Sequence, residues 1–370
     1  MGRAVVLAVA TLVVTSAVIT ACGGDDNRRG NSTSANPGGH GATVDCGGKS
    51  GLTAEGSSAQ LNAMALFNQA WGRLCPGKKV SYSATGSGSG REQFIAGHID
   101  FAGADSPLVS EQIAPAAKRC NGHPAWDLPL VFGPVALVYN LPDVPTLVVS
   151  ADALAKIFSG MITNWNDPTL MALNRGVALP DSRITPVYRT DPSGTTDNLQ
   201  RYLTVAAPQS WTRGVGTRFQ GGAGQGAAST AGVVEAVRAT PGAIGYVEKG
   251  FADQAGVPYA QIDNGSGAVP LTNDTARNAV NAAKFVASGS DLVLDLDWIY
   301  GSHERNTYPF VLATYEIVCS AGYDADTATA IKSFLTAAAG DGQTGLSSGG
   351  YVPLPDKVKE RLVTAIDAMQ

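Results

Sequence analysis

Residues 128–139 read LPLVFGPVALVY, a stretch in which nearly every side chain is apolar. A continuous apolar run of this length predicts a β-strand that is buried on both faces. Residues 308–319 read YPFVLATYEIVC and form a second run of the same kind. We expect the chain to cross from one domain to another along the first run and to cross back along the second.

Short strands alternate with amphipathic helices on either side of these runs. Residues 52–54 read as a strand and 275–287 as a helix of the second domain. This alternation is typical of α/β layers around a largely parallel sheet. The helix that follows the first strand has an apolar face made of Leu61, Met64, Phe67, Trp71 and Leu74.

The chain is too long for one ordinary hydrophobic core, since about 325 residues remain after the N-terminal segment. We place domain I at 46–137 plus 308–370 and domain II at 138–307. A discontinuous first domain with two crossings is the architecture of the periplasmic-binding-protein-like fold, type II. By analogy with such proteins, we expect the two domains to close about a hinge.

The first residues predict export from the cytoplasm. Arg3 precedes an apolar run, so residues 1–21 are expected to be a signal peptide rather than a spanning helix. The segment ending at Ala21-Cys22 resembles a bacterial lipobox, which implies that the Cys22 thiol carries lipid after cleavage. Residues 22–45 are rich in Gly, Ser, Asn and Asp, and we expect a flexible tether. The predicted location is the extracytoplasmic face of the cell membrane.

The remaining four cysteines predict disulfide bonds. An even number in an oxidising compartment favours two disulfides over a metal site. Three pairings are possible; we favour Cys46–Cys75, which closes a local loop, and Cys120–Cys319, which joins the C-terminal segment to the first domain. The net charge of −5 exerts no overall attraction on anions, so an anion site must rely on local dipoles and hydrogen bonds.

Small polar residues stand at three predicted helix starts. They are Ser57-Ser58, the run 87–90, and Ser193-Gly194-Thr195. Helix starts leave backbone N–H groups unpaired, and Ser or Thr adds a hydroxyl donor. Each stretch alone is also compatible with ordinary helix capping. Together, they predict a shell of donors around one small oxyanion.

Three charged residues sharpen this hypothesis. Arg189 follows a predicted strand, and Asp191 is placed to hold its guanidinium while the other edge binds ligand oxygens. Asp105 should repel an anion unless the ligand donates a proton. Phosphate carries a proton near neutral pH and sulfate does not, so Asp105 would discriminate between them. Capping of the following helix is the alternative role for Asp105.

The sequence resembles the phosphate-binding protein of the high-affinity ABC phosphate importer over essentially the whole mature chain. Three stretches carry the resemblance in order and spacing: 86–90, 100–108 and 189–195. Family members often have Thr-Phe where this chain has Ser58-Ala59. The pair in this chain retains a hydroxyl and a backbone N–H. The resemblance implies a phosphate shell of Ser58, the Ala59 backbone, Ser87, Asp105, Arg189, Ser193, Gly194 and Thr195.

The resemblance also implies a function without catalysis. The chain would capture inorganic phosphate between its domains and deliver it to the permease subunits of an ABC transporter. It would act as a monomer held to the membrane by its lipid, with no cofactor, no metal and no nucleic-acid partner.

Three other functions are weighed against this interpretation. A hydrolase is disfavoured because Gly88 stands where a nucleophile elbow needs serine and no histidine lies in the serine-rich stretches. A binder of sulfate or molybdate would share the fold, and Asp105 is the residue that distinguishes it. An adhesion lipoprotein would need clustered exposed aromatic residues, whereas the tryptophans are dispersed along the chain.

Overall fold

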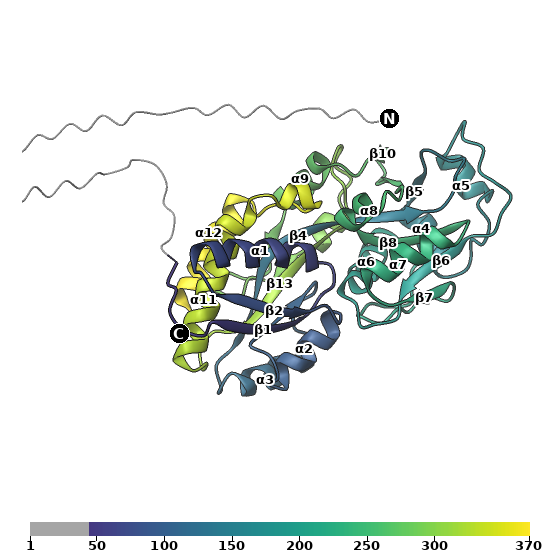
Figure 1. Ribbon diagram of the computed structural model, residues 1–370. Coiled ribbons are helices and arrows are strands. Elements are labelled where there is room, and N and C mark those ends of the chain that lie inside the picture. The colour runs from purple at the N-terminus through teal and green to yellow at the C-terminus, as the bar shows by residue number, and fades with distance from the viewer. Residues whose placement is uncertain (1–43) are drawn as a thin grey trace, which may run out of the picture. The chain divides into compact units, whose positions relative to one another are not determined.

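A computed structural model describes residues 44–370, and its main element is an eight-stranded sheet (Figure 1). The expected signal peptide, the lipidated Cys22 and the tether up to residue 43 lie outside the described residues. None of the helices between residues 44 and 370 is long and apolar enough to cross a membrane. In spatial order the strands are β2 (Lys79–Ser83), β1 (Gly51–Gly56), β3 (Phe101–Ala104), β13 (Val311–Cys319), β4 (Ala125–Tyr139), β8 (Ala243–Glu248), β6 (Thr185–Arg189) and β7 (Gln225–Ala227).

The sheet was predicted to be largely parallel, and its centre departs from that prediction. The flanking pairs β2–β1, β1–β3, β8–β6 and β6–β7 are parallel, as is typical when helices connect the strands. The three central pairs, β3–β13, β13–β4 and β4–β8, are antiparallel. Two smaller sheets consist of β10 (Ala268–Val269), β9 (Gln261–Asp263) and β5 (Val148–Ser150), and of β11 (Lys284–Phe285) and β12 (Leu294–Asp295).

The two apolar runs, 128–139 and 308–319, form the neighbouring strands β4 and β13. β4 pairs with β13 from Ala125 to Pro134 and with β8 from Val135 to Tyr139. Every side chain of β13 is buried, and β4 is buried from Asp127 onward. β13 and β4 together therefore join the two parallel flanks of the sheet, β13 through β3 and β4 through β8. The domain boundaries at 137/138 and 307/308 stay a prediction.

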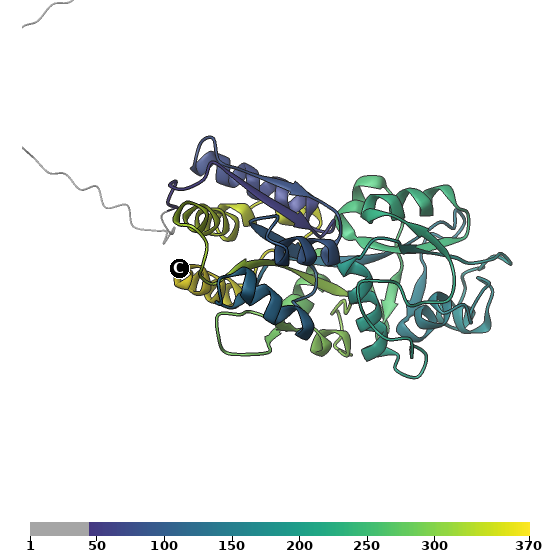
Figure 2. The same cartoon turned by 90° about the horizontal axis from the view of Figure 1, so that it is seen from below.

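Helices cover the sheet, and the first of them, α1, packs against α11 near the C-terminus. α1 and α11 lie side by side, and α11 also contacts α12, so purple and yellow segments adjoin in both views (Figures 1 and 2). The helices are α1 (Leu61–Leu74), α2 (Ser87–Ile95), α3 (Ser110–Arg119), α4 (Ala151–Phe158), α5 (Pro168–Leu173), α6 (Gly194–Ala206), α7 (Ser229–Ala239), α8 (Lys249–Ala255), α9 (Asn273–Asn281), α10 (Asp297–Tyr300), α11 (Ala325–Ala339) and α12 (Asp356–Ala368), with short 3₁₀ turns at Asp341–Gln343 and Leu346–Gly349.

Two helix predictions need correction. The apolar face of α1 is buried at Met64, Phe67 and Trp71, but Leu61 and Leu74 at its two ends are each 41% exposed. The helix expected over 275–287 ends at Asn281, because β11 follows directly and pairs with β12. Tertiary pairing overrides helix propensity in this segment.

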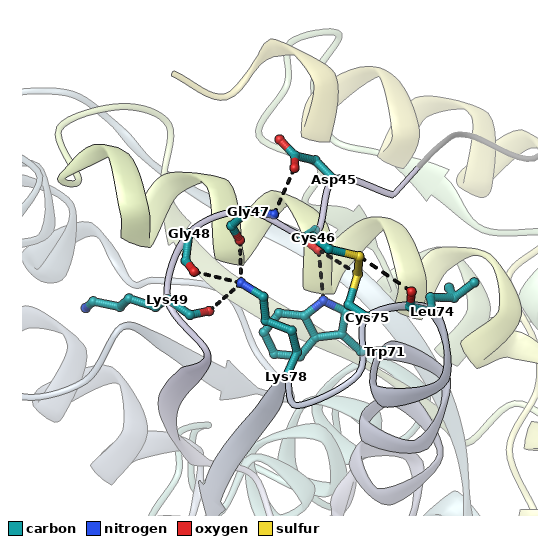
Figure 3. The surroundings of a disulfide bond; sticks show 10 residues. Asp45, Cys46, Gly47, Gly48, Lys49, Trp71, Leu74, Cys75 and Lys78 are labelled. Atoms are coloured by element: carbon teal, nitrogen blue, oxygen red, sulfur yellow. Dashed lines mark hydrogen bonds between the residues drawn. A yellow bond between two sulfur atoms is a disulfide. The ribbon is translucent and has the colours of Figure 1, made fainter.

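Both favoured disulfides are present. Cys46 is bonded to Cys75 and Cys120 to Cys319. Figure 3 shows the first, which fixes the segment ahead of β1 to the C-terminal end of α1. Beside it, the Lys78 ammonium donates to the carbonyl oxygens of Gly47, Gly48 and Lys49, the last two at 2.8 Å. The first described residues are therefore held both by a disulfide and by the hydrogen bonds of Lys78.

Candidate functional site

Three chain segments meet where strands of the sheet end and helices begin. Gly86, just ahead of α2, donates its N–H to the Gly56 carbonyl at the end of β1, at 2.7 Å. Gly88 in the first turn of α2 donates to the carbonyl of Pro192, just ahead of α6, at 2.9 Å. The starts of α2 and α6 thus touch, although β2 and β6 stand near opposite ends of the sheet. This junction contains the residues singled out from the sequence.

Asp105 lies at the centre of the junction, directly after β3. Its Oδ1 accepts hydrogen bonds from Ser57 Oγ at 2.6 Å and Thr314 Oγ1 at 2.7 Å, while its Oδ2 accepts from Ser87 Oγ at 3.2 Å. Burial raises the pKa of Asp105 to about 6; the charge of Glu248 acts in the same direction, and the three hydroxyls oppose it. The N-cap of α3 is Val109, so Asp105 does not cap that helix.

Arg189 supplies a positive charge to this junction. It ends β6, is 3% exposed, and donates from Nε to Asp191 Oδ1 at 2.8 Å and from Nη2 to Asp191 Oδ2. Burial alone would lower the pKa of Arg189, but the hydrogen bonds and charge of Asp191 leave it raised. Its remaining terminal nitrogen, Nη1, donates to Thr230 Oγ1 at 3.3 Å. Asp191 therefore fixes one edge of the guanidinium and leaves the other edge directed into the junction.

The start of α6 presses against Asp105. Gly194 has no side chain, and a Cβ built on it would lie 2.6 Å from Asp105 Oδ2. Ser193 accepts the Thr196 N–H on its Oγ at 3.2 Å and so caps the helix. Thr195 is buried and donates its hydroxyl to Glu248 Oε1 at 2.7 Å. Only glycine at position 194 allows this approach of the helix to the carboxylate.

The loop after β1 contributes Ser58 and Ala59. Ser58 Oγ lies 3.0 Å from Thr230 Oγ1 and accepts the Thr230 N–H at 3.3 Å. The Ala59 N–H, which the resemblance assigns to the ligand, donates instead to Ser57 Oγ at 3.0 Å. The structure thus brings together all eight residues of the predicted shell, with the Ala59 amide engaged inside its own loop.

Four further buried residues belong to this cluster and are not in the predicted phosphate shell. Ser57 was indicated by the sequence only as part of the Ser57-Ser58 stretch at a predicted helix start. Glu248 ends β8 as Arg189 ends β6, so a charged residue after an apolar strand was the available signal. Thr314 interrupts the apolar run of β13, and Thr230 stands in the first turn of α7.

Other features of the described chain are distinct from this cluster. Between residues 44 and 370, no group of three or more His, Cys, Asp or Glu is arranged to hold a metal ion. A groove of about 710 Å³ lined by Trp298, His303 and Arg305 shares no residue with the cluster. The buried carboxylate, arginine and hydroxyls of the junction are suited to binding a small oxyanion by hydrogen bonds.

Comparison with known proteins agrees with this chemistry. Residues 29–339 match the model of the PBP superfamily domain. The chain is 46% identical to "Phosphate-binding protein PstS 3" of Mycobacterium tuberculosis over 98% of both chains, and 44% identical to "Phosphate-binding protein PstS 2" of the same organism, again over 98% of each. Among solved structures, a high-affinity periplasmic phosphate-binding protein (PfluDING) bound with phosphate is similar, with a TM-score of 0.69, 21% identity, and coverage of 85% of this chain and 93% of that one.

Proposed function

Because this chain belongs to the PBP superfamily and, within it, to the family of phosphate-binding proteins, we propose that it captures inorganic phosphate outside the cytoplasm and delivers it to the permease of an ABC transporter. Membership of this family makes the chain a binding protein rather than an enzyme. One observation carries the proposal for this chain's own residues: a buried arginine and a buried carboxylate, Arg189 and Asp105, lie in one cluster of hydroxyls.

The two charges would divide the recognition of phosphate between them. The free edge of Arg189 would bind negatively charged oxygens, helped by the N–H groups at the start of α6. Asp105 is a hydrogen-bond acceptor and would accept a hydrogen bond from the hydroxyl of protonated phosphate. Ser58, the Ala59 backbone, Ser87, Ser193, Gly194 and Thr195 would complete the shell, after the Ala59 amide exchanges its bond to Ser57 for a ligand oxygen.

Binding requires the site to open, because its residues are almost fully buried. We propose that domain I, 46–137 plus 308–370, and domain II, 138–307, separate about the central strands β4 and β13. Small-angle scattering with and without phosphate tests this: the radius of gyration should be smaller with phosphate, and an unchanged value contradicts hinge closure.

The N-terminal segment would hold the protein at the membrane. We propose cleavage before Cys22, lipidation of that residue, and a tether over 22–45 that carries a monomer. Cys22→Ala should move the protein from the membrane fraction to the soluble fraction and abolish incorporation of labelled palmitate. Persistence of the variant in the membrane fraction would argue against the anchor.

Equilibrium binding to the purified chain tests the central proposal. Titration with phosphate, arsenate and sulfate should give tight binding of phosphate, competition by arsenate and none by sulfate. Tighter binding of sulfate than phosphate would assign the chain to another oxyanion. Hydrolysis of a phosphate ester in proportion to protein concentration would assign it to an enzyme.

A further inference from the structure

Asn198 makes a hydrogen bond between the two predicted domains and has no part in the predicted phosphate shell. It lies one turn after Gly194 in α6 and is 4% exposed. Its Nδ2 donates to the backbone carbonyl oxygen of Asp105 at 2.7 Å and to that of Gly194 at 2.8 Å. Because residue 105 belongs to predicted domain I and residue 198 to predicted domain II, the first of these bonds crosses from one domain to the other.

The partners of the Asn198 amide determine its orientation. An asparagine side chain has two donors on its nitrogen and one acceptor oxygen, and a carbonyl oxygen can only accept. The nitrogen therefore faces the carbonyls of Asp105 and Gly194, which leaves Oδ1 for the hydroxyl of Tyr300. Burial raises the pKa of Tyr300, so its hydroxyl keeps the proton that it donates to Oδ1. The whole amide is thus paired, as a buried polar group requires.

Helix formation alone does not explain an asparagine at this position. Asparagine is a poor residue for a helix interior, because its side chain competes for backbone hydrogen bonds. Asn198 is nevertheless inside α6, and its amide reaches beyond that helix to Asp105, which follows β3, and to Tyr300, which ends α10. The side chain therefore serves contacts between elements rather than α6 itself.

The Asn198 bond is also separate from the carboxylate that is proposed to recognise phosphate. It reaches the backbone carbonyl of Asp105, not the side chain. The carboxylate oxygens of Asp105 are held by the hydroxyls of Ser57, Ser87 and Thr314, all of which belong to predicted domain I. Loss of the Asn198 amide would therefore remove a bond between the domains and leave the carboxylate in place.

We propose that Asn198 is a latch, which holds the two domains together and so slows the release of any oxyanion that is bound between them. This inference rests on the proposed function, in which the domains separate to admit the ligand. The bond from Asn198 to the Asp105 carbonyl exists only while the domains are together, and both groups can bond to water once they part. A bond made only in the closed form raises the population of that form and, with it, the apparent affinity for the ligand.

Asn174 offers a matched control within one domain. It is also 4% exposed, and its Nδ2 donates to the carbonyl oxygens of Val148 and Leu170 at 2.8 Å. Its Oδ1 accepts the Val148 N–H, again at 2.8 Å. Both partner residues lie in predicted domain II, so loss of the Asn174 amide should lower the stability of that domain and leave closure unchanged.

The test compares Asn198→Ala with Asn174→Ala in the full chain, by calorimetry and stopped-flow kinetics with phosphate and with arsenate. We expect Asn198→Ala to weaken the binding of both anions roughly tenfold, about the effect of one hydrogen bond. The loss should appear as faster dissociation, with the association rate within about twofold of the wild type. Asn174→Ala should unfold at a lower temperature but bind both anions within about twofold of the wild-type affinity.

Two results would overturn the inference. Equal affinities of the two variants, or a loss in Asn198→Ala that comes from slower association, would show that Asn198 does not hold the closed form. A changed ratio of phosphate affinity to arsenate affinity in Asn198→Ala would assign this residue to recognition of the anion instead.

A further variant decides the matter if Asn198→Ala does not fold, as judged by thermal unfolding. Tyr300→Phe keeps the ring and removes the hydroxyl that holds Asn198 Oδ1, so phosphate should dissociate about two- to threefold faster. A wild-type dissociation rate in Tyr300→Phe would then contradict the latch. Failure of the wild type to bind phosphate would refute the proposed function, whereas tight wild-type binding with insensitive variants refutes only this inference.

Discussion

Gly194, the first residue of α6, lies so close to Asp105 that a Cβ placed on it would come within 2.6 Å of the Asp105 Oδ2 atom. Real Cβ atoms do not approach other atoms this closely, so Gly194→Ala must push α6 away from the carboxylate. We expect Gly194→Ala to weaken phosphate binding roughly 10- to 100-fold, the usual effect of overpacking a close contact. Calorimetric titration of the variant checks this.

A second glycine provides the control for that measurement. Gly232 stands inside α7, and a Cβ there would meet no atom closer than 3.8 Å. Gly232→Ala should therefore bind phosphate like the wild type and be slightly more stable, since alanine favours helix more than glycine does. If Gly194→Ala bound phosphate as tightly as Gly232→Ala, α6 would not approach Asp105 in the bound state.

Replacing Asp105 should change which anions bind. Asp105→Asn puts an amide donor where the structure has an acceptor, so we expect weaker phosphate binding and measurable sulfate binding. Competition titrations with both anions give the ratio of phosphate affinity to sulfate affinity. Asp127→Asn is the matched control, because Asp127 is also buried but accepts the Leu108 N–H outside the cluster. Unchanged discrimination in Asp105→Asn would refute the proton-accepting role.

Removing Arg189 should weaken binding of every oxyanion. The guanidinium is held by Asp191 with one edge facing the cluster, so Arg189→Ala loses a charge-assisted contact and leaves Asp191 without its partner. We expect a loss of at least about tenfold in phosphate affinity. Arg201→Ala serves as comparison, because its ion pair with Asp297 is 42% and 45% exposed and contributes little. Similar affinities of the two variants would place the anion elsewhere.

Glu316 should make the protein less stable as pH rises. Burial raises the pKa of Glu316 to about 8 from 4.5, so the folded state keeps a proton that the unfolded chain releases. The stability from this group is fully present below pH 4.5 and is lost as pH rises to about 8. We expect Glu316→Gln to be more stable than the wild type at pH 8 by about 1 kcal/mol or more, with little difference near pH 4.5.

Urea unfolding at both pH values measures this difference. Glu360→Gln, at an exposed position of α12, should follow the wild type at both. A Glu316→Gln protein whose advantage is the same at pH 4.5 and pH 8 would show that the effect comes from packing rather than from the proton.

The sequence was sufficient to predict the elements whose burial is complete. β4 and β13 appear as apolar runs because both faces of each strand are covered. Strand direction was not predictable in the same way, since a buried strand has the same composition in a parallel and an antiparallel pair. The end of α9 was missed for a related reason: residues 284–285 have no local signal for a strand and pair with β12 only in the folded chain.

The site residues also fall into two groups, those that the sequence indicated and those that it did not. Asp105 and Arg189 stand at strand ends next to recognisable motifs, so the sequence indicated both. Glu248 also ends a strand, but no neighbouring motif marks it, and its role depends on contacts with α6 and α7 that only the fold creates. A single polar residue in an apolar run, such as Thr314, was the signal that went unused.

The Cys46–Cys75 disulfide has a mechanical consequence. A pull on the chain ahead of Cys46 reaches a covalent branch point, where the load passes through the sulfur atoms to Cys75. Residues 47–74, which include β1 and α1, are thereby bypassed by the force. Stretching the N-terminal segment cannot strip β1 from β2 and β3 while this bond is intact. β1, the strand that precedes Ser57 and Ser58, therefore does not carry a force applied to the N-terminal segment.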